Sequence, residues 1–301
     1  MKPLLFRPFV LVLALLLLAP ACIDPRIDLG TDDDDAVDDD DAVDDDDAGF
    51  DGSPPVYDGE CPTFGAGLNE DFVSSGRDRR FRLALPDEPS GAPLVFAWHW
   101  LGGNSQQIME WLGFDELAED EGVIVVAPDS DGYPSEWRFD QLDPDNADAL
   151  LFEDILACLH QQFDVDLSRV HATGMSAGGL WTTWLIMNKS EWLASAAPLS
   201  GGVYEPWYQS PAEPIPVMLV WGGPADIYGN FSFDVASRDF SEQLRADSHF
   251  VVECDHGGGH TAPQGAASLT WRFMEDHPKD LEAEPWAGGL PSDLPSYCVI
   301  P

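Results

Sequence analysis

The sequence predicts an α/β fold in which a mostly parallel central sheet is covered by helices on both faces. Over residues 60–301, short apolar runs alternate with longer stretches in which apolar residues recur at every third or fourth position. The runs at 94–100 (LVFAWHW) and 123–127 (VIVVA) are apolar without alternation, which is typical of parallel strands buried on both faces. Because ligands bind beyond the carboxyl ends of the strands in such sheets, we expect functional residues in the loops that follow strands.

Glycine or proline follows most of the apolar runs and marks the turns at which they end. The stretches between these turns have either helical spacing or the short, continuous apolar character of a strand. In chain order, we expect strands at residues 79–86, 94–100, 123–127, 170–173, 196–199, 216–221 and 250–254, and helices at 108–118, 147–163, 177–187, 233–246 and 266–275.

The first residues have the layout of an export signal. A basic start with Lys2 and Arg7 precedes an apolar run at 9–18, and small residues lead up to Cys22. The run is shorter than the ~20 apolar residues that a membrane-spanning helix needs, so it predicts a signal peptide over 1–21. A cysteine at this place resembles a bacterial lipoprotein signal, in which Cys22 would carry the lipid anchor. The alternative is an ordinary secreted protein.

Negative charge is concentrated in the segment that follows. The chain carries 55 acidic and 14 basic side chains, and residues 23–59 alone hold 16 Asp and one Arg. Asp runs separated by Ala-Val pairs repel one another, so we expect 22–59 to be a disordered tether and 60–301 to be the globular domain. The repeat lacks the alternating acids and turn glycine of a calcium loop. A net charge of −41 also argues against nucleic-acid binding, which needs clustered Lys and Arg.

The cysteine count agrees with export. If Cys22 is lipidated, an even number remains, and an oxidising compartment permits two disulfides whose pairing the sequence leaves open. The spacing is not that of a thiolate zinc site, and we expect no metal. The remaining cysteines are Cys61, Cys158, Cys254 and Cys298.

A GxSxG motif, Gly174 to Gly178, lies between the predicted strand at 170–173 and the predicted helix at 177–187. A strand before and a helix after are the context of a nucleophile elbow, a sharp turn that exposes a serine hydroxyl at the edge of the sheet. The amino-terminal end of the helix adds free N–H groups that stabilise developing negative charge. The motif therefore predicts Ser176 as a nucleophile.

A serine nucleophile needs a base, and the base needs an acid that orients it. On this fold the chain order is serine, acid, histidine. Asp226 follows the predicted strand at 216–221 by a short turn, and Asp234 is its rival further along the chain. In the loop after the last predicted strand, CDHGGGHT, we favour His260 over His256, because the preceding glycines allow a close approach to the sheet edge.

Two N–H donors are needed to stabilise the oxyanion of an acyl-transfer intermediate. We expect one from Ala177, directly after the nucleophile. The other is expected in the loop after the first core strand, His99 to Gly103, where we choose Leu101 ahead of Trp100.

The sequences HWLGG, GMSAGG, PADIYG and GGGHT resemble those of the extracellular α/β-hydrolase esterases, and in particular the feruloyl esterase and polyhydroxybutyrate-depolymerase-like branch. The resemblance covers about residues 78–277. It implies Ser176 as nucleophile, Asp226 as acid and His260 as base, hydrolysis of carboxylic esters, and no metal or organic cofactor. Trp100 departs from the family, which usually has Gly after the histidine of this loop.

The substrate is expected to meet aromatic side chains, because such faces suit phenolic acyl groups or sugar rings. Our candidates for the pocket lie at or near the predicted carboxyl-terminal ends of strands and the loops that follow them: Trp100, Trp137 and Tyr228.

These observations predict a monomeric serine esterase that is exported and either lipid-anchored in the cell envelope or secreted. Its expected substrates are polymer- or cell-wall-linked feruloyl or acetyl esters, or short hydroxyalkanoate esters. Two alternatives remain open: a peptidase or other acyl-transfer hydrolase on the same fold, and a non-catalytic surface binding protein that retains it.

Overall fold

The computed structural model describes residues 52–141 and 143–301. The expected signal peptide, Cys22 and residues 23–51 of the expected Asp-rich tether lie outside these residues and stay predictions. None of the described helices is long and apolar enough to cross a lipid bilayer.

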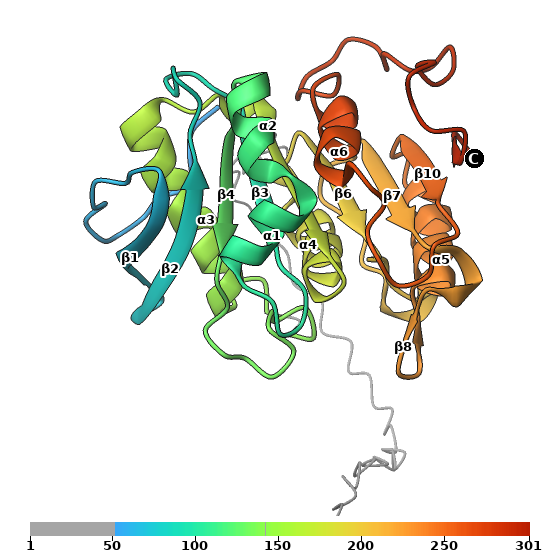
Figure 1. Cartoon of the computed structure of the whole chain (residues 1–301), viewed down its shortest axis with the longest axis horizontal. Coiled ribbons are helices and arrows are strands. Elements are labelled where there is room, and N and C mark those ends of the chain that lie inside the picture. The colour runs from blue at the N-terminus through green and yellow to red at the C-terminus, as the bar shows by residue number, and fades with distance from the viewer. Residues whose placement is uncertain (1–51, 142) are drawn as a thin grey trace, which may run out of the picture. The chain divides into compact units, whose positions relative to one another are not determined.

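A nine-stranded sheet forms the centre of the described domain, in the order β1-β2-β4-β3-β5-β6-β7-β10-β11 (Figure 1). The six strands from β4 to β10 pair in parallel, and the edge strands β1, β2 and β11 pair antiparallel. The strands are β1 (Gly67–Ser74), β2 (Arg77–Ala84), β3 (Leu94–Trp98), β4 (Ile124–Pro128), β5 (Val170–Met175), β6 (Ser195–Leu199), β7 (Val217–Trp221), β10 (Val251–Asp255) and β11 (Cys298–Val299).

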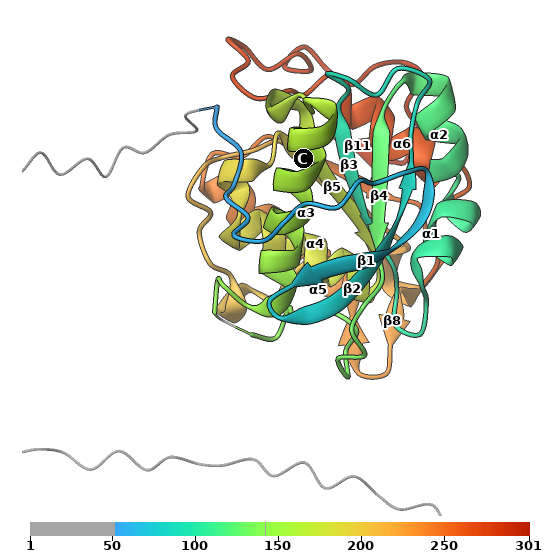
Figure 2. The same cartoon turned by 90° about the vertical axis from the view of Figure 1, so that its left-hand side faces the viewer.

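Helices cover both faces of the sheet (Figure 2). One face carries α1 (Ser105–Leu112), α2 (Phe114–Glu121) and α6 (Ala266–Met274), and the other carries α3 (Ala147–Phe163), α4 (Ala177–Asn188) and α5 (Phe233–Ala246). The core strands β3 to β7 are buried along their whole length. Their side chains alternate between two apolar layers, so that Leu94 and Phe96 belong to one layer and Val95 and Ala97 to the other.

The predicted α/β architecture with a mostly parallel sheet is confirmed, and the bounds of α3 and α5 agree with the prediction. The predicted helix at 108–118 is instead two helices, because Gly113 adopts a φ of 85° and ends α1. Short or charged strands were not predicted. They are β1, β11 and the separate hairpin of β8 (Ile227–Tyr228) and β9 (Phe231–Ser232).

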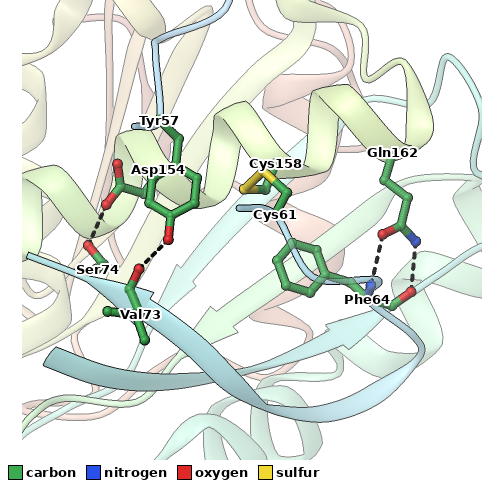
Figure 3. The surroundings of a disulfide bond; sticks show 8 residues. All are labelled: Tyr57, Cys61, Phe64, Val73, Ser74, Asp154, Cys158 and Gln162. Atoms are coloured by element: carbon green, nitrogen blue, oxygen red, sulfur yellow. Dashed lines mark hydrogen bonds between the residues drawn. A yellow bond between two sulfur atoms is a disulfide. The ribbon is translucent and has the colours of Figure 1, made fainter. Parts of the chain in front are cut away.

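The segment that leads into the domain is fixed against α3 (Figure 3). A disulfide joins Cys61 to Cys158 on that helix. Close by, Phe64 exchanges two hydrogen bonds with the Gln162 side chain, with lengths of 2.8 and 2.7 Å. The Tyr57 hydroxyl donates to the carbonyl of Val73 at the end of β1. These contacts attach the first described residues to the face of the sheet that carries α3.

A second disulfide joins Cys254 on β10 to Cys298 on β11. The structure thus resolves the pairing that the sequence left open. Because β10 leads directly into the loop that carries His260, this bridge also holds the base of that loop to the carboxyl-terminal segment.

We expect both disulfides to contribute to stability by restricting the unfolded chain. The bridges close loops with sequence separations of 97 and 44 residues, for which the chain-entropy relation gives about 5 and about 4 kcal/mol respectively. Replacing both cysteines of either pair by alanine should lower the free energy of unfolding by amounts of this order in urea titrations. A double variant as stable as the parent would show that the bridge is not formed.

Candidate active site

Ser176 occupies a sharp turn between β5 and α4. Its φ of 58° and ψ of −114° are rarely adopted by a residue with a side chain. The flanking glycines make this turn sterically possible. A Cβ atom at Gly178 would overlap the carbonyl oxygen of Trp98, and one at Gly174 would lie 2.5 Å from the carbonyl oxygen of Gly178. The elbow that GMSAGG predicted is therefore present, with Ser176 at its apex.

His260 bridges Ser176 and Asp226. Its Nε2 lies 2.9 Å from Ser176 Oγ, and its Nδ1 lies 2.6 Å from Asp226 Oδ1. Because a carboxylate can only accept, Nδ1 carries the proton and Nε2 is free to accept from the serine hydroxyl. The imidazole also stacks on the ring of Phe233, with the ring centroids 4.6 Å apart. Hydrogen bonding and stacking together fix the orientation of the ring.

The loop that carries His260 approaches β7 closely. The N–H of Gly259 donates to the carbonyl of Gly222 at 2.9 Å. A Cβ atom at Gly222 would overlap the backbone of Gly259. The close approach is therefore made possible by Gly222 on the strand side, whereas Gly259 in the loop has a φ of 74°, in the region that favours glycine.

Asp226 is fully buried in the turn that follows β7. Its Oδ2 accepts from the Ser200 hydroxyl and from the N–H of Gly222, both at 2.8 Å, while Oδ1 faces His260. A buried carboxylate is tolerated when donors surround it in this way. Ser200, at the end of β6, was not predicted. The only sequence signal for it is its position directly after a predicted strand.

The rival residues lie outside this chain of hydrogen bonds. Asp234 lies in the first turn of α5, where it accepts from the Trp221 indole N–H at 2.8 Å and forms an ion pair with Arg238. His256 accepts from the N–H of Gly258, and burial lowers the pKa of its imidazole. Asp234 and His256 therefore have local structural partners.

The loop His99–Gly103, here called the oxyanion loop, follows β3. The N–H of Gly103 donates to the Trp100 carbonyl at 2.9 Å, and the N–H of Gly102 donates to the carboxylate of Glu136 at 2.9 Å. Both N–H groups are thus engaged within the protein, whereas Leu101 and Ala177 line the cavity beside Ser176. This placement is compatible with the predicted oxyanion donors.

A cavity of 470 Å³ opens beside Ser176 and His260, with a mainly apolar lining. Two of the residues that we expected in the pocket, Trp100 and Tyr228, line this cavity, and Tyr228 belongs to the β8–β9 hairpin. The described lining contains no Asp, Glu, Lys or Arg side chain. Several aromatic residues of the wall were not predicted: Trp111, Phe139, Phe231 and Phe233.

The prediction that Trp137 lines the pocket is wrong. Its indole is fully buried and packs against Trp98 and His99, with ring centroids 4.9 and 4.8 Å apart. Its Nε1–H donates to the carbonyl of His99 at 2.8 Å. A buried indole N–H needs such an acceptor, and the backbone of the oxyanion loop provides it. Trp137 thus supports the loop from behind.

No family model matches the chain. It is 26% identical to an oxidized polyvinyl alcohol hydrolase from Sphingopyxis sp., over 71% of this chain and 79% of that protein. It is 30% identical to poly(3-hydroxyalkanoate) depolymerase C from Paucimonas lemoignei, over 44% of this chain and 33% of that protein. It is 27% identical to a probable feruloyl esterase C from Aspergillus niger, over 48% of this chain and 53% of that protein.

Solved structures agree on the fold. The crystal structure of native pOPH superposes with a TM-score of 0.63 at 21% identity, covering 80% of this chain and 96% of that one. A thermostable esterase gives a TM-score of 0.53 at 20% identity, covering 72% of this chain and 63% of that one.

The chain therefore has the α/β-hydrolase fold and is a sequence relative of carboxylic-ester hydrolases that include a polyhydroxyalkanoate depolymerase and feruloyl esterases.

Proposed function

We propose that this protein is an exported serine esterase whose catalytic triad is Ser176, His260 and Asp226. The observation that carries the proposal is the continuous chain of hydrogen bonds from Ser176 Oγ through the imidazole to the buried carboxylate. This is the arrangement that makes a serine hydroxyl nucleophilic near neutral pH.

In the reaction, Ser176 Oγ forms a bond to the ester carbonyl carbon while its proton passes to His260 Nε2. The tetrahedral intermediate collapses as the bond to the alcohol oxygen breaks, and His260 returns the proton to the departing alcohol. Water then attacks the acyl-enzyme, giving one proton to His260, and the carboxylic acid leaves as Ser176 regains its proton. Asp226 stabilises the imidazolium that forms in each half of the reaction.

We assign the oxyanion to the N–H groups of Leu101 and Ala177. Leu101 is supported by its place in the wall of the cavity and by the engagement of the Gly102 and Gly103 N–H groups elsewhere. Ala177 is supported by its position as the first residue of α4, where the helix leaves its N–H groups unpaired. Removing one such donor typically costs about 10²- to 10³-fold in kcat.

The substrate that we propose is an uncharged ester with an apolar or aromatic acyl group, linked to a polymer or the cell wall, or a short hydroxyalkanoate ester. The apolar, aromatic wall of the cavity supports it, as do relatives described as a polymer depolymerase and as feruloyl esterases. The acidic chain would also repel polyanionic substrates. Attachment through a lipid at Cys22 would place the enzyme in the cell envelope.

Kinetics on chromogenic esters from acetyl to feruloyl test the triad. His260→Ala should reduce kcat below about a thousandth of the parent value, because the serine then has no base. Asp226→Asn should cause a loss of about 10⁴-fold, because the imidazole is then held in the wrong tautomer. Near-normal turnover by either variant would disprove that assignment.

Faster hydrolysis of the matching anilide than of the ester would favour a peptidase.

Ser200 should act through Asp226. Ser200→Ala removes one donor to the buried carboxylate. A hydrogen bond to a charged group contributes about 1.5–3 kcal/mol, so we expect kcat to fall by about 10- to 100-fold with KM unchanged. Ser248→Ala is the matched control. Ser248 also has a positive φ, of 71°, against 46° for Ser200, so the control tests the loss of a serine hydroxyl at a left-handed position that does not contact Asp226. Equal kcat values for the two variants would contradict a role for Ser200.

A further inference from the structure

The loop between β4 and α3 holds the oxyanion loop at several points. The N–H of Ser130 donates to His99 Nε2 at 3.3 Å, and the indole N–H of Trp137 donates to the His99 carbonyl at 2.8 Å. Glu136 binds a later residue of the oxyanion loop: its Oε1 accepts from the N–H of Gly102 at 2.9 Å. A segment that follows one strand thus fixes the backbone that follows the neighbouring strand.

The Glu136 carboxylate is engaged at both oxygens. Oε1 accepts from Gly102, and Oε2 accepts from the hydroxyl of Ser130. Since the Ser130 N–H also binds His99, Glu136, Ser130 and His99 form one connected network around the oxyanion loop. The Glu136 carboxylate therefore has a donor at each oxygen, one of them the N–H that follows Leu101 in the oxyanion loop.

Two successive peptide groups of the oxyanion loop are oriented by this network. The Trp100 carbonyl accepts from His99 Nδ1–H and from the N–H of Gly103, both at 2.9 Å. In a trans peptide the N–H points opposite to the carbonyl, so these bonds also set the direction of the Leu101 N–H. Glu136 then fixes the next peptide group by holding the N–H of Gly102.

The backbone of Glu136 gives independent support. Its φ is 68°, in the left-handed region that favours glycine. Of the six other described non-glycine residues with positive φ, two belong to the site: Ser176 is the proposed nucleophile, and Ser200 donates to the proposed acid. Strained conformations of this kind persist where the surroundings fix them, and they gather at functional sites.

We propose that Glu136 is a positioning residue that sets the Leu101–Gly102 backbone for binding the oxyanion. The inference rests on the proposed esterase function, since it assigns Glu136 a role in the transition state of that reaction. A residue that acts in this way affects kcat and the binding of transition-state analogues, and leaves the binding of the ground-state ester unchanged.

Glu136→Gly is the first test, because glycine adopts the observed φ without strain and the variant should fold. We expect kcat on a chromogenic ester to fall by about 10- to 100-fold, which is at most the lower end of the effect on kcat of removing a whole oxyanion donor. KM should stay within twofold of the parent value, and the thermal midpoint of unfolding should not change. Affinity for a trifluoromethyl ketone that mimics the tetrahedral intermediate should fall by the same factor as kcat. Glu136→Gln keeps an acceptor for Gly102, so it should retain kcat within about threefold.

Asp140→Asn is the matched control, because Asp140 lies in the same loop and accepts only from the Tyr133 hydroxyl among the bonds of the described residues. It should match the parent. The inference is overturned if Glu136→Gly keeps kcat within twofold, if the loss appears in KM instead, or if Glu136→Gln loses as much as Glu136→Gly. An inactive parent enzyme that does not react with the ketone would instead contradict the proposed function itself.

Discussion

The buried carboxylate of Asp226 is the group on which the rest of the site depends. A charge placed in an apolar interior is unfavourable unless donors surround it. Here the donors come from three places along the chain: Ser200 after β6, Gly222 after β7, and His260 after β10. The hydrogen bonds of one carboxylate therefore connect the ends of three neighbouring parallel strands. They also orient the imidazole so that its other nitrogen faces Ser176.

Backbone strain is distributed over the same machinery. Ser176 is the proposed nucleophile, Ser200 donates to the proposed acid and Glu136 accepts from the oxyanion loop, and all three have positive φ values. Each is held by hydrogen bonds to a different strand end or loop. The carboxyl-terminal ends of the strands therefore supply the rigidity that these conformations need. The apolar cavity beside them adds aromatic walls and few polar groups, which would strengthen electrostatic interactions with a bound ester.

Much of this arrangement could be predicted from the sequence because its signals are local. The continuous apolar runs identified the core strands, and Gly174 and Gly178 identified the elbow around Ser176. The order of strands and loops then led to Asp226 and His260. Contacts between distant segments carry no such signal. Ser200, Glu136 and the pairing of Cys61 with Cys158 depend on how strand ends meet in space. Trp137 was misplaced because aromatic character alone does not distinguish a pocket wall from the support behind it.

The most direct test of the central claim is to react the protein with a fluorophosphonate and to locate the adduct by peptide mass spectrometry. If the hydrogen bonds from Asp226 through His260 activate the Ser176 hydroxyl, we expect a single modified residue, Ser176, and no modification in the Ser176→Ala variant. Absence of labelling in the folded parent protein, or a label on another serine, would contradict the account.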